Sequence, residues 1–191
     1  MSEFLYQIDL KLFYFFNHTI SNPLFDNFFP FITESKNWNI AYIILFLILI
    51  IKGGRFGRIA AAGTILLVIA TDQTSSNLLK NLIERIRPCN ALPDVNILAT
   101  CSQSFSFPSS HAVNNFGGAV YFSRLYPQYK VALFIVAVLV SLSRVYVGVH
   151  YLSDVIGGAI IGSAIGYLFS ELIKKIDSSE LLKKSFIKKN S

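Results

Sequence analysis

Charged residues are scarce in this sequence, and their scarcity narrows the class of protein. Only 15% of the 191 residues are charged, whereas 53% are hydrophobic. A chain of this size supplies several membrane-spanning helices but not a large soluble domain in addition. The N-terminal residues include Glu3 and Asp9 instead of the basic start of a signal peptide, so we expect no cleaved leader. The composition predicts a single integral membrane domain.

Cysteine is also rare. Only Cys89 and Cys101 are present, and neither has suitably spaced metal-ligating neighbours, so we predict no metal site and no cofactor. Both thiols fall in one loop, where an oxidising compartment would allow a disulfide. Two free thiols remain the alternative, because the sequence does not give the distance between them.

Hydrophobic runs bounded by charge, proline or glycine recur five times, which predicts an all-α, polytopic membrane helical bundle. The runs lie at 38–51, 59–79, 112–123, 131–147 and 155–172. Several are shorter than the roughly 20 residues that a spanning helix needs. Their polar ends must therefore lie among lipid headgroups or against protein.

The N-terminal region is harder to assign. Residues 1–35 have apolar side chains at helical spacing, and we expect an interfacial amphipathic helix followed by a short aromatic helix at 25–31. A sixth transmembrane helix is the alternative. We expect residues 1–175 to form one membrane domain and 176–191 to form a basic cytoplasmic tail.

Lysines and arginines outside the polar clusters gather on one side of the predicted bundle. They occur in the 52–58 loop, at Arg124 and Lys130, and in the tail. The positive-inside rule makes this side cytoplasmic, which places the opposite helix ends on the periplasmic face. This topology accounts for most of the net charge of +6. Binding of nucleic acid therefore has no support.

The strongly polar residues cluster at the other helix ends, and the first cluster contains two cations. Lys80 and Arg87 are seven residues apart and precede Pro88. A helix continuing to Pro88 would place both cations on one face, where they could bind one phosphate. Arg85 is expected to reach toward headgroups instead, and helix-end cations in general can do the same.

In the second cluster, Pro108 precedes Ser109, Ser110 and His111 at an expected helix start. A serine cap leaves backbone N–H groups pointing outward, and a helix N-terminus attracts anions. His111 would lie beside a bound phosphate as a proton donor. A plain capped helix with an incidental histidine is the alternative.

The third cluster combines Arg144 at a helix end, a turn through Gly148, and His150 four residues before Asp154. If both were helical, the carboxylate would lie beside the imidazole. Asp154 would then accept the proton on one ring nitrogen and leave the other free to attack. A purely structural His–Asp pair would not explain why the other cations reach the same end.

Together these residues suit phosphoryl transfer without a metal. The cations would stabilise charge on the phosphoryl oxygens, His150 would attack phosphorus, and His111 would protonate the departing lipid oxygen. Water activated by His111 would then release phosphate from a phosphohistidine.

The three clusters resemble the tripartite signature of the type 2 phosphatidic acid phosphatase superfamily, which includes the vanadium-dependent haloperoxidases. The signature reads here as Lys80, Arg87 and Pro88, then Pro108, Ser109, Ser110 and His111, then Ser143, Arg144, His150 and Asp154. The resemblance covers about residues 37–175 and implies an all-helical phosphatase with a phosphohistidine on His150 and acid/base work by His111. It also implies phosphate binding by Lys80, Arg87, Ser109 and Arg144. Ser110 replaces the usual glycine, and its amide can still bind phosphate.

The chain is similar in size to compact bacterial members of that family. This implies a phosphorylated lipid substrate in the bacterial inner membrane, with lipid A 1-phosphate and undecaprenyl pyrophosphate ahead of phosphatidylglycerophosphate or phosphatidic acid. A phosphotransferase, a transporter with Asp72, His111 and His150 as a proton relay, and an inactive scaffold are the alternatives. The oligomeric state stays open.

Overall fold

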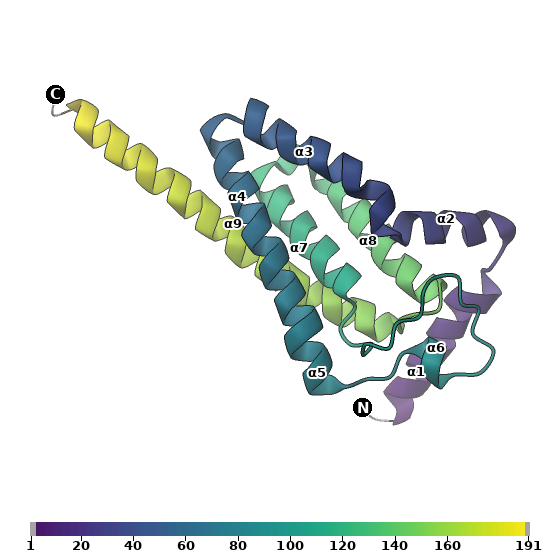
Figure 1. Ribbon diagram of the computed structural model, residues 1–191. Helices are drawn as coiled ribbons and strands as arrows, with labels where there is room; N and C mark the ends of the chain where they lie inside the picture. The colour runs from purple at the N-terminus through teal and green to yellow at the C-terminus, as the bar shows by residue number, and fades with distance from the viewer. Residues whose placement is uncertain (1–2, 190–191) are drawn as a thin grey trace.

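The fold is all-helical over residues 3–189, which a computed structural model describes, with side chains placed through residue 179. Its helices are α1 (Glu3–Tyr14), η1 (Phe15–Thr19), α2 (Pro23–Thr33), η2 (Ser35–Trp38), α3 (Asn39–Lys52), α4 (Gly54–Asp72), η3 (Gln73–Leu79), α5 (Lys80–Ile83), α6 (Pro88–Ala91), α7 (Ser110–Leu125), η4 (Pro127–Tyr129), α8 (Lys130–Tyr146) and α9 (Leu152–Lys189). Figure 1 shows α7 in the middle of the bundle, with α4, α8 and α9 around it.

The five hydrophobic runs all form helices, as predicted, and these are α3, α4 with η3, α7, α8 and α9. In the part of the chain that the structure describes, four helical segments are long and apolar enough to cross a membrane: Ser35–Lys52, Gly54–Ala91, Pro127–Tyr146 and Leu152–Ser179. The fifth helix, α7, has 16 residues and packs most extensively against α9. α3 buries none of its residues, as expected for a helix that faces lipid.

The N-terminal region forms two helices, as predicted. α1 has 12 residues and α2 has 11, so each is too short to span a bilayer. α2 begins where the Asn22 side chain accepts hydrogen bonds from the backbone N–H groups of Leu24 and Phe25. α1 exposes Phe4 on its outer face and buries Phe13 against the start of α9. These helices therefore pack at one end of the bundle.

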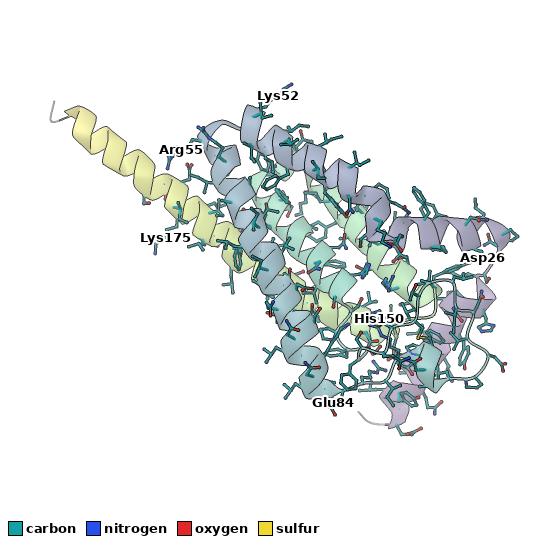
Figure 2. The ribbon with its side chains drawn as sticks, viewed as in Figure 1. Asp26, Lys52, Arg55, Glu84, His150 and Lys175 are labelled. Carbon is teal, nitrogen blue, oxygen red and sulfur yellow. A yellow bond between two sulfur atoms is a disulfide. The ribbon has the colours of Figure 1, made fainter. Side chains whose placement is uncertain are left out.

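The basic residues of the loop between α3 and α4 and of α9 lie at the end of the bundle opposite His150. Figure 2 shows Lys52, Arg55 and Lys175 at one end, whereas His150 and Glu84 lie at the other. The basic residues that define the expected cytoplasmic side are thus separated from the predicted site. The expected basic tail continues α9 as a helix to Lys189, and residues 190–191 lie outside the described part.

Small residues bring α7 and α9 into backbone contact. A Cβ atom built on Gly162 would lie 2.1 Å from the Val113 carbonyl oxygen, and one on Gly166 would lie 2.2 Å from the Gly117 carbonyl oxygen. Only glycine fits at such contacts. These glycines thus serve packing within the bundle, and they fix the helix that carries His111 against the helix that begins beside His150.

Candidate active site

His150 lies in the turn between α8 and α9. Gly148 makes the turn with a φ of +84°, a conformation that side chains disfavour. The backbone N–H of His150 then donates to the Arg144 carbonyl at 3.2 Å. The imidazole is 2% exposed. His150 therefore precedes α9 instead of lying within it, and Asp154 occupies the first turn of that helix.

Hydrogen bonds to both ring nitrogens define the tautomer of His150. Nη1 of Arg87 lies 3.0 Å from Nε2, and Oδ2 of Asp154 lies 3.4 Å from Nδ1. A guanidinium can only donate, so Nε2 must accept, and the proton of the neutral ring is on Nδ1. Asp154 faces that proton, as predicted. The lone pair of Nε2 consequently points toward the cations.

The surroundings of His150 favour its neutral form. Burial is the main reason that the pKa of His150 falls from 6.5 to about 3. The positive charges of Arg87 and Arg144 lower this pKa as well, while the hydrogen bond to Asp154 opposes the shift. The ring is therefore uncharged at neutral pH, as a nucleophile must be.

The first cation cluster reaches the site by a different path from the one predicted. The helix ends at Ile83, because Glu84 adopts the left-handed conformation with a φ of +51°. The expectation of a helix continuing to Pro88 was wrong. Arg87 instead lies in extended backbone and donates to the carbonyl and hydroxyl oxygens of Ser104 at 2.7 and 2.9 Å. Lys80 and Arg87 are both buried, 6% and 5% exposed.

Arg85 is a second correction, because it does not extend toward headgroups. Its Nη1 lies 2.6 Å from Oδ1 of Asp154, and its Nη2 lies 2.6 Å from Oδ2 of Asp9 on α1. The side chain is 12% exposed. Two carboxylates hold the guanidinium in the protein interior, which outweighs the tendency of a long cationic side chain to seek water.

The second cluster begins α7 at Ser110, close to the predicted helix start. Ser109 occupies the N-cap position, but its side chain makes no capping bond. The Ser109 hydroxyl is buried and, among the described residues, has no hydrogen-bonding partner. Ser110 Oγ lies 3.2 Å from Ser76 Oγ. A buried hydroxyl of this kind is a group that a phosphate oxygen could satisfy.

Thr33, at the end of α2, and Ser106, in the loop before α7, belong to the site although the sequence analysis did not identify them. Nε2 of His111 lies 3.2 Å from the carbonyl oxygen of Thr33, and Nη1 of Arg144 donates to the Thr33 hydroxyl at 2.9 Å. Nε of Arg144 is buried with no partner in the described structure. Ser106 donates its hydroxyl proton to Oδ2 of Asp154. Thr33 thus joins the His111 and Arg144 side chains.

Cys89 and Cys101 form a disulfide, with their Cα atoms 6.3 Å apart. Of the two alternatives left by the sequence, the disulfide is the one that the structure has. It closes a short loop that starts beside Arg87 and ends before Ser104. The disulfide therefore holds the chain just after Arg87 close to the chain just before Ser104, the residue to which Arg87 donates.

The predicted site residues meet at one end of the bundle. His150 and Asp154 contact each other, Arg87 contacts His150, and Thr33 links His111 to Arg144. Cationic donors, an unpaired serine hydroxyl and a neutral imidazole in one buried place can bind a phosphate and attack its phosphorus.

Comparison with known proteins agrees with this chemistry. A family model described as "PAP2 superfamily" matches residues 61–177. A lipid A 4'-phosphatase from Bacteroides thetaiotaomicron is 33% identical over 92% of this chain and 81% of its own. The crystal structure of Aquifex aeolicus LpxE has a TM-score of 0.69 and 27% identity, covering 86% of this chain and 95% of that one. A transmembrane PAP2-type phosphatidylglycerolphosphate phosphatase from Bacillus subtilis has a TM-score of 0.67 and 25% identity, covering 93% of this chain and 88% of that one.

Proposed function

The chain belongs to the PAP2 superfamily and is a membrane lipid phosphatase, and we propose that it removes a phosphate from lipid A through a phosphohistidine on His150. The reaction needs no metal in this proposal, because the chain supplies its own cations. The site faces the periplasm, since the loops rich in lysine and arginine lie at the opposite end.

The orientation of His150 is the observation that carries the mechanism. Its Nε2 lone pair accepts a hydrogen bond from Arg87, and its Nδ1–H faces Asp154. When a phosphate arrives, its oxygens take the N–H groups of Arg87, and Nε2 is left free toward phosphorus. Arg87 thus donates to the Nε2 lone pair in the free enzyme and binds the phosphoryl group during the reaction.

In the first step, Nε2 of His150 forms a bond to phosphorus while the bond from phosphorus to the lipid oxygen breaks. The leaving oxygen takes a proton from His111. Lys80, Arg87 and Arg144 stabilise the charge on the other phosphoryl oxygens. Asp154 stabilises the phosphoimidazolium by accepting the Nδ1–H hydrogen bond.

In the second step, water attacks phosphorus and the bond to Nε2 breaks. His111, which has lost its proton, takes one from the water, so the enzyme returns to its starting state. Inorganic phosphate leaves with the oxygen that the water brought. No proton or charge is left unaccounted for after one cycle.

Lipid A is the substrate that the comparisons favour. The Bacteroides relative is named for the 4'-phosphate, whereas the family resemblance of the sequence puts lipid A 1-phosphate and undecaprenyl pyrophosphate first, so both phosphate positions of lipid A need testing. Undecaprenyl pyrophosphate and phosphatidylglycerophosphate are the alternatives, the second because of the Bacillus relative. In all four the acyl or prenyl chains stay in the bilayer while the phosphate enters the buried site.

The test is phosphate release by detergent-purified protein in the presence of a chelator. The substrates are lipid A carrying either phosphate alone, undecaprenyl pyrophosphate, phosphatidylglycerophosphate and phosphatidic acid. We expect release from one lipid A monophosphate to exceed the others. His150→Ala should abolish release, whereas His18→Ala should preserve it, because His18 lies outside the site against Asp94.

The reaction can also be stopped by acid-free quenching to trap phosphoprotein. A labile phosphoryl group should appear in wild-type protein and be missing in His150→Ala. Phosphate release by His150→Ala at a rate near that of wild type would exclude His150 as the nucleophile. Release from no lipid would exclude the proposed substrates, and release only without chelator would exclude the metal-free reaction.

A further inference from the structure

Asp154 divides its two oxygens between different partners. Oδ2 accepts from the Ser106 hydroxyl and from the backbone N–H of Tyr151 at 2.9 Å, and it faces Nδ1 of His150 at 3.4 Å. Oδ1 accepts from Arg85 at 2.6 Å. The Arg85 bond to Oδ1, together with the two donors on Oδ2, fixes the rotation of the carboxylate about its Cβ–Cγ bond, and with it the direction in which Oδ2 points.

Arg85 is itself held by α1. Its Nη2 donates to Oδ2 of Asp9 at 2.6 Å, and its guanidinium lies 3.9 Å from the centre of the Tyr151 ring. Asp9 also accepts from the backbone N–H of Ser153 at 3.0 Å and from the Ser153 hydroxyl. Asp9 on the N-terminal helix thus contacts both Arg85, which binds Asp154, and Ser153, which precedes Asp154 in the chain.

Asp9 is unusual for its position in the sequence. It lies in a helix whose outer face is apolar, yet it is only 4% exposed. Burying a carboxylate costs free energy unless it is paired, so a buried aspartate in this helix implies that its partners compensate for the cost. Asp9 precedes the matched family segment 61–177, so nothing in that comparison accounts for it.

We propose that Asp9 and Arg85 are positioning residues that orient Asp154 toward His150, which makes α1 a working part of the catalytic unit. The proposal rests on the role of His150 described above. Neither residue touches the reacting atoms. Their effect should appear in the chemical step, through the direction of the Asp154 carboxylate, and not in the binding of the lipid phosphate.

The variants Asp9→Asn and Arg85→Lys test this with little change in size. Asparagine keeps an oxygen for Ser153 but removes the charge that holds Arg85. Lysine keeps the positive charge but cannot bridge two carboxylates. Glu3→Gln is the matched control, because Glu3 is an exposed carboxylate on the same helix whose side chain accepts from Gln7 within α1.

We expect each variant to lower kcat by about 10-fold with KM changed less than twofold, since each loses a charge-assisted hydrogen bond. The double variant should be no slower than the slower single variant, because both break the same chain of contacts. Glu3→Gln should match wild type. Activities are compared per folded molecule, with the thermal midpoint measured for each protein.

A spectroscopic readout separates positioning from general loosening. The chain has three histidines, so the 15N resonances of His150 can be assigned by comparison with His150→Ala. Wild type and Asp9→Asn should both show the Nδ1–H tautomer, because Arg87 still donates to Nε2. The Nδ1 resonance should nevertheless shift in Asp9→Asn, because the Asp154 carboxylate that faces this nitrogen has turned. The resonances of His18 should not change, because that ring lies away from the network.

The outcomes are distinct. Asp9→Asn with wild-type kcat and an unchanged Nδ1 resonance overturns the proposal. A fall in activity that only follows the fraction of unfolded protein, or additive effects in the double variant, overturns it too. Failure of the proposed nucleophile would be seen separately, as turnover by His150→Ala.

Discussion

The backbone contact between α7 and α9 makes Gly162 sensitive to substitution, although this glycine is not itself in the site. A Cβ at Gly162 would lie 2.1 Å from the carbonyl oxygen of Val113 and 2.8 Å from its carbonyl carbon. Ordinary van der Waals contact begins at 3.4 Å, so Gly162→Ala must separate the two backbones by about 1.3 Å. No side-chain rotation can relieve this, because the atoms belong to the main chain.

The energetic cost follows from this geometry. Overpacking a core costs about 1–3 kcal/mol, and a clash with backbone belongs at the upper end. For a chain of this length, about 3 kcal/mol corresponds to a thermal midpoint lower by roughly 6–12 °C. The same displacement moves His111 on α7 away from His150, and a misplacement of 1 Å in a catalytic site can cost about 100-fold in rate.

Gly118→Ala is the matched control, since it is a glycine on α7 whose added Cβ would meet nothing within 4 Å. It should keep wild-type kcat and gain up to about 1 kcal/mol from helix propensity. Thermal unfolding in detergent and phosphate release measure both effects. If Gly162→Ala matched Gly118→Ala in midpoint and kcat, the close approach of the helices would have no role in holding the site.

Three further predictions concern the site itself. Asp154→Asn should retain the fold and slow phosphate release by about 10³-fold, because the Nδ1–H of His150 loses its carboxylate. Unfolded His150 binds a proton below pH 6.5, whereas the folded residue, with its pKa of about 3, does not. The contribution of His150 to the free energy of unfolding should therefore be fully present above pH 6.5 and fall by about 1.4 kcal/mol per pH unit below it. On acidification, the thermal midpoint of His150→Asn should fall less steeply than that of wild type. Thr33→Val removes the acceptor of Arg144 and should lower stability by about 1–3 kcal/mol. Added inorganic phosphate, which offers that acceptor again, should raise the midpoint of Thr33→Val more than that of wild type.

Much of the bundle could be predicted because its signals are local. Each span is a hydrophobic run with a clear boundary, and the helix start near Ser110 follows a proline and two serines. The spacing of His150 and Asp154 also placed them in contact, although His150 precedes the helix. A separation of four residues still brings them into contact, because the Asp154 side chain, in the first turn of α9, points back toward the residues that precede the helix.

The paths of Arg85 and Arg87 could not be predicted in the same way. The helix was expected to reach Pro88, but Glu84 leaves it early, and the bias of a residue before proline toward extended backbone was the available signal. Arg85 could only be assigned once Asp9 and Asp154 were known to lie nearby. These contacts join residues 76 and 69 positions apart, and no local pattern encodes them.

Contacts of this length also set the order in which the enzyme can be completed during its synthesis. Asp9 and Arg85 are synthesised early, but Asp154 is made 69 residues after Arg85. A nascent chain that ends before α9 already contains His150, but it lacks Asp154, the carboxylate that the two earlier residues hold. Until the last helix inserts, Arg85 has Asp9 as its only carboxylate partner among the contacts described. Phosphatase activity therefore reports the insertion of the final helix, and it can serve as an assay of membrane assembly.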